Sequence, residues 1–537
     1  MITRRHLLAG ATAGTALLAV GCTASNSPQP PGTTEQPRVD PKRHQVTTRT
    51  PASDLVVPAG PAGAVVASRE LLAAATAVVV IVPNAASPEP TATPSPTAAA
   101  PDAAPAGSAS PSPDGSPSAT ATPPAPGPEA AASVARALGI PLFEDSPELA
   151  AELDRLQTRT VIAYGGTPQG AGSREVVAGT ATAEEIRLDG LPTKAQPAEI
   201  LALGSGELAP AVAVTLASAG LEPTSLAGPH PGVNAESTAL VKGHEGVVVA
   251  AGDGFGTAEQ FARQVEVTRT ASELPGGGVA PFPGRRMIAL YGHPQTASLG
   301  MMGEQPPAEA VARVKRLAEE YQRLLPGDTV IGAFEIITTV ASSSATSDGD
   351  YSYETPIELI MPWVEAAEAG GLYVVLDLQP GRTDFLTQAK RYEELLRRPG
   401  VGLALDPEWR LPPNGKHLVQ VGQVGVDDVN AVGAWLADFV AENKLPPKVL
   451  TLHQFQTRMV TERSRLVTDR PEVQYLVHVD GQGGQAAKQS TWGVIKRDLP
   501  AHTWLGWKNF EDEDIPMLTP KQTVDTVQPT PYFISYQ

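Results

Sequence analysis

The sequence predicts an α/β protein with two parts: an N-terminal Rossmann-like parallel α/β domain or domains, and a C-terminal (β/α)8 TIM-like barrel. Short apolar runs alternate with amphipathic helical segments along most of the 537 residues, as in parallel sheets covered by helices. About eight such units fit into residues 284–537. That number of units in that length favours a closed barrel over an open, doubly wound sheet.

The first 22 residues are typical of a bacterial export signal. Arg4 and Arg5 precede a short apolar run that ends at Cys22, the only cysteine in the chain. The run is too short to span a bilayer well, which favours a signal peptide over an anchor helix. TRRHLL resembles a twin-arginine signal, and AVGC resembles a lipobox with Ala19 in place of the usual leucine. We expect lipid on Cys22 and a mature chain held at the outer face of the cell membrane; the alternative is a small residue within an apolar segment.

The amino-acid composition of residues 23–280 distinguishes a spacer, a folded domain and an insertion within that domain. Residues 23–52 lack apolar periodicity and are rich in Pro, Ser and Thr, which predicts a flexible spacer between the lipid and the folded part. Residues 53–280 are predicted to form the first α/β domain. Within it, residues 86–128 are composed largely of Pro, Ala, Ser and Thr, a composition that predicts a disordered insertion.

Strands and helices are expected to alternate on both sides of that insertion. Apolar runs predict strands at 54–57, 77–83, 140–144, 159–165 and 199–206. Helices are expected at 68–76, 129–139, 146–156 and 207–220, and a last strand–helix unit is expected at 246–265.

Three strings in this domain, ALGIPLF, SPELAAELDRL leading into TVIAYGG, and GDGFGTAEQFA, resemble the type-2 cell-wall-binding repeats of Gram-positive surface proteins. The resemblance implies association with the cell wall but identifies no wall-binding residue. GDGFGTAEQ is glycine-rich and follows a strand, as in a phosphate-binding loop. It lacks the G-x-G-x-x-G spacing and a Walker lysine, so we expect no nucleotide cofactor.

The barrel elements follow one another closely. Strands are expected at 286–294, 328–336, 372–379, 401–409, 448–455, 474–481, 502–510 and 531–537. Helices or helical turns between them are expected at 306–325, 355–370, 384–398, 426–444, 457–466, 486–499 and 519–527.

Reactive or polar side chains stand where these strands end. In such barrels the C-terminal strand ends line the active-site mouth, so these side chains should gather there. We predict catalytic roles for Glu408, Asp406, Asp480 and Asp377, and substrate binding by Glu335, Gln379, His453, Trp409, Trp507, Lys508 and Asn509. Any one of these acids alone is more often a helix cap or a salt-bridge partner, but a ring of them at one pole is harder to explain that way.

Asp406 and Glu408 lie two residues apart, so on a strand they would share a face. We expect Glu408 to be the proton donor, because the apolar indole of Trp409 should raise its pKa. We expect Asp406, lying deeper, to stay ionised if it is hydrogen-bonded. Indole faces beside carboxylates suit sugar rings, although Trp409, Trp504 and Trp507 could equally close the barrel rim.

The barrel also resembles the C-terminal domain of uncharacterised actinobacterial lipoproteins that carry the same wall-binding repeats. The strings that support this are FEIITTVAS, GDYSYE, LDLQPGRTDFLTQA, GLALDPEW, LHQF, HVDGQG and GWKNFEDEDIPMLTP. This resemblance implies no reaction. The D-x-x-D-x-D-x-E spacing of chitinase-like barrels is also absent, and only D-x-E remains, at Asp406 and Glu408.

Three functional classes remain open. The first is a glycosidase-type hydrolase of wall or capsular glycan, with no cofactor and no metal. The second is a metal-dependent hydrolase such as a phosphodiesterase, whose ligands would come from Asp377, Asp406, Glu408, His453 and Asp480. The third is a non-catalytic wall-binding lipoprotein. A net charge of −18 argues against nucleic acid as a partner.

Overall fold

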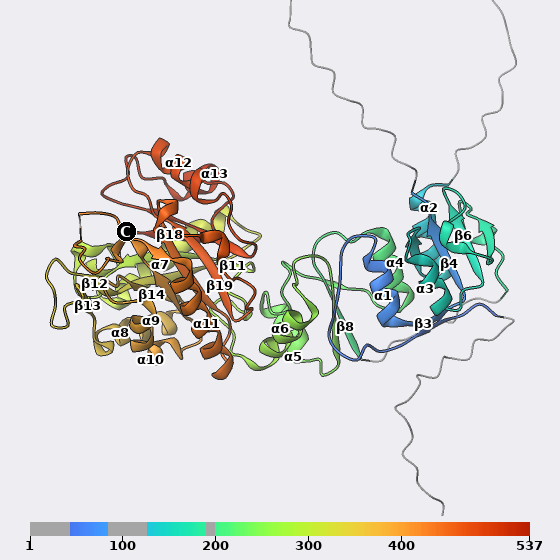
Figure 1. Cartoon of the computed structure of the whole chain (residues 1–537), viewed down its shortest axis with the longest axis horizontal. Coiled ribbons are helices and arrows are strands. Elements are labelled where there is room, and N and C mark those ends of the chain that lie inside the picture. Colours follow the sequence, from blue (N-terminus) through green and yellow to red (C-terminus); the bar gives the residue numbers. More distant parts are fainter. Residues whose placement is uncertain (1–42, 84–125, 190–198, 418) are drawn as a thin grey trace, which may run out of the picture. The chain divides into compact units, whose positions relative to one another are not determined.

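The computed structural model describes residues 43–83, 126–189, 199–417 and 419–537 (Figure 1). The predicted signal peptide with Cys22, most of the predicted spacer and most of the predicted insertion lie outside these ranges. Within the described ranges, no helix combines the length and the apolar character needed to cross a membrane.

The N-terminal region contains two four-stranded parallel sheets. The first has the order β5-β4-β6-β7, and β4 is buried along its whole length, as expected for a strand covered on both faces. The second has the order β2-β10-β8-β9. The strands are β2 (Leu55–Val57), β4 (Ala77–Ile81), β5 (Leu142–Glu144), β6 (Thr160–Tyr164), β7 (Glu175–Ala178), β8 (Ile200–Gly204), β9 (Thr224–Ser225) and β10 (Val247–Ala251).

Helices of this region pack on the two sheets, which confirms the predicted parallel α/β class. They are α1 (Gly63–Leu71), α2 (Pro128–Leu138), α3 (Leu149–Arg155), α4 (Pro210–Ser218), α5 (Ala235–Lys242) and α6 (Ala258–Thr270). One predicted helix, at 68–76, is wrong in its second half. There β3 (Leu72–Ala75) pairs antiparallel with β1 (Val46–Thr48), so tertiary pairing overrides the helical preference of its alanines.

The C-terminal region is a closed barrel of eight parallel strands, as predicted. The order β11-β21-β20-β19-β17-β15-β14-β12 is closed by pairing of β11 with β12. The strands are β11 (Arg285–Gly292), β12 (Thr329–Ala341), β14 (Tyr373–Leu378), β15 (Val401–Leu405), β17 (Lys448–Gln454), β19 (Val473–Val479), β20 (Thr503–Asn509) and β21 (Phe533–Tyr536). A short strand, β13 (Ser352–Glu354), extends the sheet antiparallel to β12.

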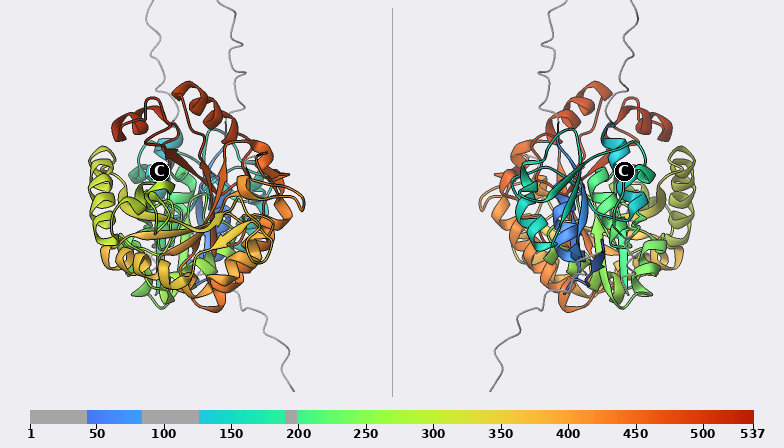
Figure 2. Two further views of the ribbon diagram at one scale, coloured as in Figure 1. Left: turned by 90° about the vertical axis from the view of Figure 1, so that its left-hand side faces the viewer. Right: turned by 90° about the vertical axis from the view of Figure 1, so that its right-hand side faces the viewer.

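Helices surround the barrel strands (Figure 2). They are α7 (Pro307–Leu324), α8 (Ile357–Gly370), α9 (Phe385–Arg391), α10 (Glu393–Leu396), α11 (Val426–Glu442), α12 (Gln485–Ile495) and α13 (Pro520–Thr526). The helix predicted at 457–466 is replaced by two 3-10 turns and the two-residue strand β18 (Val460–Thr461). Arg463 donates to the carbonyl oxygens of Ile495 and Arg497, which fixes this segment without a helix.

The barrel lumen changes from apolar to polar along its axis. Its lower part, toward the N-terminal ends of the strands, is filled by an apolar cluster that includes Phe282, Met287, Tyr373, Leu476 and Phe533. The next inward positions carry Glu335, Asp377, His453 and His478, all fully buried. Asp406, Asp480 and Lys508 follow, nearer the C-terminal ends. The packed lower part thus forms a rigid floor beneath a polar upper part.

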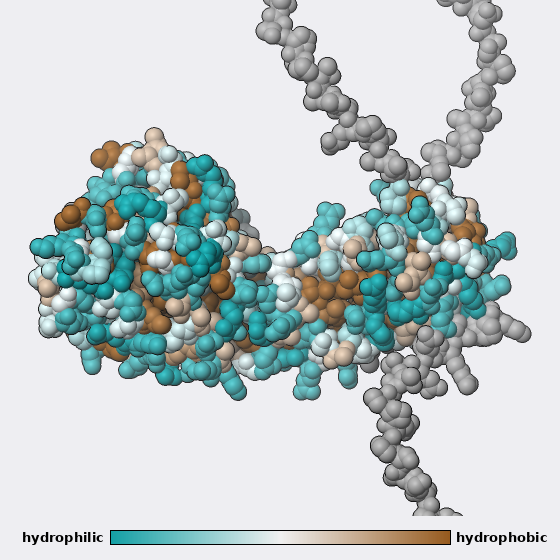
Figure 3. Space-filling view, in the orientation of Figure 1, coloured by the Kyte–Doolittle hydropathy of each residue, from teal (hydrophilic) through white to brown (hydrophobic). Residues whose placement is uncertain are grey.

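The outer surface shown in Figure 3 is largely hydrophilic, with apolar side chains in small groups. Tyr353, Val419 and Ile515 are among the most exposed large apolar residues, at 52%, 78% and 77% of their accessible surface. All three lie on strand or loop segments at the C-terminal side of the barrel strands. Scattered exposed apolar residues are usual on protein surfaces, so these three alone identify no binding face.

Candidate active site

A cavity of about 580 Å³ opens at the C-terminal ends of the barrel strands. Three kinds of side chain line it. Asp406, Glu408, Asp480 and Glu513 contribute carboxyl groups, and Lys508 contributes an ammonium group. Aromatic rings are supplied by Tyr291, Trp409, Phe455 and Phe510. Carboxyl groups beside aromatic rings in a concave site are suited to a polar ligand with apolar faces.

Asp406 and Glu408 both reach this cavity, but not by the strand geometry that the sequence suggested. β15 ends at Leu405, and the 3-10 turn Pro407–Trp409 follows directly. The Asp406 carboxylate accepts a hydrogen bond from the Glu408 amide at 3.4 Å and so caps this turn. The turn, rather than strand alternation, brings the two carboxyl groups to the same cavity.

Both carboxyl groups favour the protonated form. Burial and the charge of Asp480 raise the pKa of Glu408 to about 7. Burial and the charge of Glu408 raise the pKa of Asp406 well above its usual value. Burial and the charge of Glu408 therefore oppose the expected ionisation of Asp406, and the opposing charge of His453 does not outweigh them.

The surroundings of Asp480 lower its pKa, in contrast to those of Asp406 and Glu408. Its Oδ2 lies 2.9 Å from Nδ1 of His453. Burial opposes ionisation of Asp480, but this hydrogen bond and the charges of His453 and Lys508 outweigh burial and hold its pKa below the usual value. Its second oxygen, Oδ1, has no hydrogen-bond partner among the described residues. Asp480 thus presents one free carboxylate oxygen close to the cavity.

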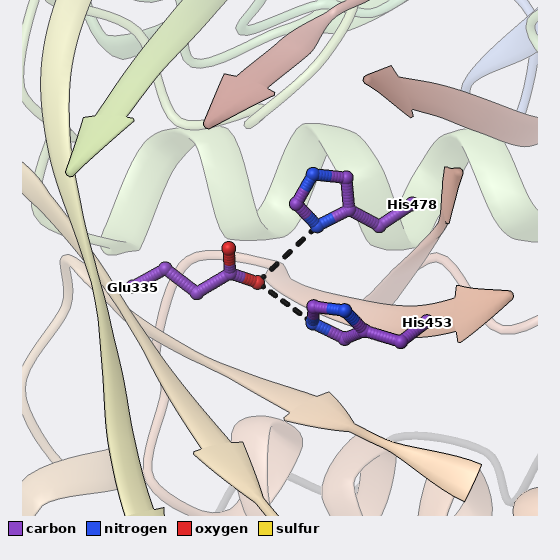
Figure 4. A group of neighbouring side chains, drawn as sticks. All are labelled: Glu335, His453 and His478. Carbon is purple, nitrogen blue, oxygen red and sulfur yellow. Dashed lines mark hydrogen bonds and ion pairs between the residues drawn. The ribbon is translucent and has the colours of Figure 1, made fainter. Parts of the chain in front are cut away.

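Below the cavity, Glu335 lies between two imidazole rings (Figure 4). Its Oε1 is 2.9 Å from Nε2 of His453 and 3.4 Å from Nδ1 of His478. Although burial opposes it, the two histidines hold the pKa of Glu335 well below its usual value. Burial lowers the pKa of His478, whereas the surrounding carboxylates raise the pKa of His453 well above its usual value.

Asp377 and Tyr291 form the contact between this layer and the cavity. The Tyr291 hydroxyl donates to Oδ2 of Asp377 at 2.9 Å. The Lys508 ammonium lies 3.4 Å from the centre of the Tyr291 ring, close enough for a cation–π interaction. Burial raises the pKa of Asp377 to about 6, even with His453 nearby.

The structure places the predicted site residues in three groups. Asp406, Glu408, Asp480, Gln379, Trp409 and Lys508 line the cavity. Glu335, Asp377 and His453 lie one layer deeper and are fully buried. Trp507 and Asn509 face away from the lumen, because alternation along β20 points Lys508 inward. The Trp507 indole donates to Asn509 and packs edge-on against Trp492, so the predicted substrate-binding role of this pair is not supported.

Sequence reasoning missed His478, Tyr291 and Ser535. The Ser535 hydroxyl lies 3.0 Å from Nε2 of His478. His478 precedes the predicted Asp480 by two residues on β19, so the same alternation that selected Asp480 should have selected it. Tyr291 likewise lies two positions before His293, near the end of the first barrel strand.

Comparisons with known proteins identify no family. No family model and no curated protein matches the chain. Among solved structures, a dihydropteroate synthase from Xanthomonas albilineans with 4-aminobenzoic acid covers 49% of this chain and 90% of that chain. Its sequence identity to this chain is 14% and its TM-score is 0.25. Values this low carry no argument about shared chemistry.

Proposed function

We propose that the barrel hydrolyses glycan of the cell envelope, with Glu408 as the proton donor to the leaving glycosidic oxygen. One observation carries this proposal: a carboxyl group whose pKa is raised to about 7 lines an open cavity beside a tryptophan. At neutral pH such a group is partly protonated and can give up its proton readily, which a general acid must do. Trp409 next to it offers an apolar surface for a sugar ring.

The second carboxylate of the reaction is best supplied by Asp480. His453 holds one of its oxygens, Oδ1 is a buried atom without a hydrogen-bond partner among the described residues, and Asp480 is one of the residues that line the cavity. That oxygen can receive a proton from water or attack the anomeric carbon. Paired carboxylates act in either way in glycosidases, and their separation decides whether configuration is retained or inverted. Analysis of the anomer first released would distinguish the two outcomes.

The cellular setting of this proposal comes from the N-terminal sequence. The export signal and Cys22 support a lipid-anchored protein outside the cell membrane. The resemblance of the N-terminal region to wall-binding repeats supports wall or capsular glycan as the partner. Together they would keep the barrel next to polymeric substrate, at high effective concentration.

The experiment is a glycan-release assay on purified mature protein with cell-wall and capsular fractions. Glu408→Gln keeps the size of the side chain but removes its proton, so release of reducing ends should fall by ~10²-fold or more. Glu513→Gln is the matched control, because Glu513 borders the same cavity but is not one of the two proposed catalytic carboxyl groups, Glu408 and Asp480. The rate of glycan release by this variant should stay within a few-fold of the parent rate. Full activity in Glu408→Gln would refute the assignment.

A second candidate, a metal-dependent hydrolase such as a phosphodiesterase, is favoured by the group formed by Glu335, His453 and His478. Phosphodiester turnover that stops with a chelator and returns with added metal would select it. Glycan binding without turnover of either substrate class would instead support the third class, a non-catalytic wall-binding protein.

A further inference from the structure

Three ligating atoms converge in the barrel lumen from strands that are not all neighbours. His453 and His478 are register partners on the adjacent strands β17 and β19. Glu335 extends from β12, on the opposite side of the closed barrel, and its carboxylate ends between the two rings (Figure 4). Nε2 of His453, Nδ1 of His478 and a Glu335 oxygen all lie within 4.8 Å of one another. All three residues are fully buried.

The other nitrogen of each ring is already fixed by a partner. Nδ1 of His453 lies 2.9 Å from the Asp480 carboxylate, which can only accept, so this nitrogen carries the proton. Nε2 of His453 faces Oε1 of Glu335 at 2.9 Å, so it is the ring nitrogen that could bind a metal ion. Nε2 of His478 lies 3.0 Å from the Ser535 hydroxyl. When that nitrogen donates to Ser535, the lone pair of Nδ1 also points at Glu335.

Buried polar atoms around this point are left without partners. Oε2 of Glu335, Oδ1 of Asp377 and Nδ1 of His478 find no hydrogen-bond partner among the described residues, although each side chain is fully buried. Asp377 Oδ1 belongs to the same group, because the carboxylate lies 3.8 Å from Nε2 of His453. Unpaired buried donors and acceptors are costly, and several of them lie close together here.

Carboxyl groups also outnumber lysine side chains in this part of the lumen. Glu335, Asp377, Asp406 and Asp480 are buried in this part of the lumen, and Lys508 is the lysine that accompanies them. A buried carboxylate must be paired with a cation or take up a proton. A bound divalent metal ion would supply two positive charges beside these carboxyl groups.

We propose that Glu335, His453 and His478, with Asp377 as fourth donor, bind one divalent transition-metal ion, of which Zn²⁺ is the first candidate. Two imidazoles with carboxylates form a mixed N/O set that suits Zn²⁺ and its first-row neighbours better than Ca²⁺ or Mg²⁺. Asp480 and Ser535 act as the outer partners that orient the two rings, as is common for metal-binding histidines.

The observed spacing is close to that of a tetrahedral site. Metal–ligand bonds of ~2.0–2.1 Å place tetrahedral donor atoms ~3.3–3.4 Å apart. Oε1 of Glu335 lies 3.4 Å from His478 and 2.9 Å from His453, and His453 lies 3.8 Å from Asp377. Opening of the Glu335–His453 contact by a few tenths of an ångström would bring this separation to the tetrahedral value. Gly506 keeps this region open, since a Cβ there would lie 3.0 Å from the His478 ring.

This inference does not depend on glycan hydrolysis. The ion would lie beneath the cavity floor, next to Asp480 and Tyr291, whose side chains also line the cavity. The ion could order the side chains of the cavity floor, or it could act on a ligand bound in the cavity. Measurement of metal content tests in either case whether the ion is present. A negative glycan-release assay would not contradict the metal site. Absence of metal would not contradict the role of Glu408 as proton donor.

The test is metal analysis of the purified full-length protein after dialysis, together with Zn²⁺ and Co²⁺ titration of chelator-treated protein. We expect about one equivalent of metal per chain, a Tm that rises with Zn²⁺, and visible Co²⁺ absorption bands. Glu335→Gln and His478→Asn should reduce the bound metal by at least ~10-fold, and Asp480→Asn should weaken its affinity by ~10–100-fold. His293→Asn is the matched control, because His293 is a buried barrel histidine that bonds Thr355 instead.

Three results would overturn the inference. The first is wild-type protein that binds neither ion and gains no stability from either; His453 would then be an imidazolium held by Glu335 and Asp480. The second is metal whose content is unchanged in folded Glu335→Gln and His478→Asn proteins. Because buried-site variants can fail to fold, the Co²⁺ spectrum of the wild-type protein provides an independent readout: bands without imidazole character would also reject the assignment.

Discussion

Asp406 and Glu408 are neighbouring buried carboxyl groups, and the pKa of each is raised. The charge of Glu408 raises the pKa of Asp406, and burial acts on both groups in the same direction. The pair therefore holds at least one proton at pH values where isolated carboxyl groups are ionised. At the residue scale, this retained proton is the property that a glycosidic leaving group requires.

A stability measurement can test the raised pKa without any substrate. The pKa of Glu408 is higher in the folded state, about 7, than its ordinary value of 4.5. The protonated form therefore favours folding: its contribution is complete below pH 4.5 and is lost as pH rises through 7. The loss is up to about 3 kcal/mol, at ~1.4 kcal/mol per pKa unit.

We expect Glu408→Gln to remove much of this loss. The wild-type free energy of unfolding should fall between pH 5 and pH 8 more steeply than that of the variant, as measured by urea denaturation at both pH values. Parallel pH dependences in wild type and Glu408→Gln would mean that this carboxyl group titrates normally.

At the scale of elements, alternation along the strands determines which groups meet in the lumen. On β20, Lys508 points into the cavity, while Trp507 and Asn509 on either side point to the helical layer. On β19, His478 and Asp480 share the inward face and reach successive layers. The side chains that alternate to the outer face of the barrel sheet contact the surrounding helices. In these contacts the space around a single glycine decides whether a larger residue fits.

Two helix glycines differ in the space around them. A Cβ on Gly433 in α11 would lie 1.8 Å from the Tyr475 hydroxyl oxygen of β19, whereas a Cβ on Gly493 in α12 would have no atom within 4 Å. Gly433→Ala should therefore destabilise the protein by ~1–3 kcal/mol through overpacking. Gly493→Ala should stabilise it by ~0.5–1 kcal/mol, because alanine loses less backbone entropy in a helix. Chemical denaturation measures both, and equal effects of the two substitutions would contradict the packing between α11 and β19.

At the scale of the whole molecule, the proposed function needs the barrel to be held outside the cell. Cys22 should carry the lipid that does this, because it follows the apolar run and is unique in the chain. Cys22→Ala should release the protein from the membrane fraction into the medium or stall its processing. Fractionation with immunoblotting measures this, and the unchanged barrel supplies the control through normal Tm and metal content. Full membrane retention of Cys22→Ala would reject lipidation at this residue.

The fold was largely predictable because it rests on local patterns. Buried strands such as β15 read as continuous apolar runs, and the amphipathic helix α7 reads as a 3.6-residue repeat. The errors arose where distant chain segments decide the outcome. Residues 72–75 pair with β1 instead of extending α1, and β2 pairs with β10, nearly 200 residues further along the chain. No local pattern encodes such a partner.

The candidate active site also has features that the local sequence predicts and features that it does not. The sequence by itself determined that carboxyl groups, His453 and Lys508 stand at the C-terminal ends of barrel strands, since each follows a recognisable strand. Only the tertiary structure decided that Glu335 crosses the lumen to meet His453 and His478, and that a turn carries Glu408 to the cavity. The physical reason is that these contacts join opposite sides of a closed sheet. Their distances depend on barrel closure and on side-chain reach, which local patterns along the chain do not contain.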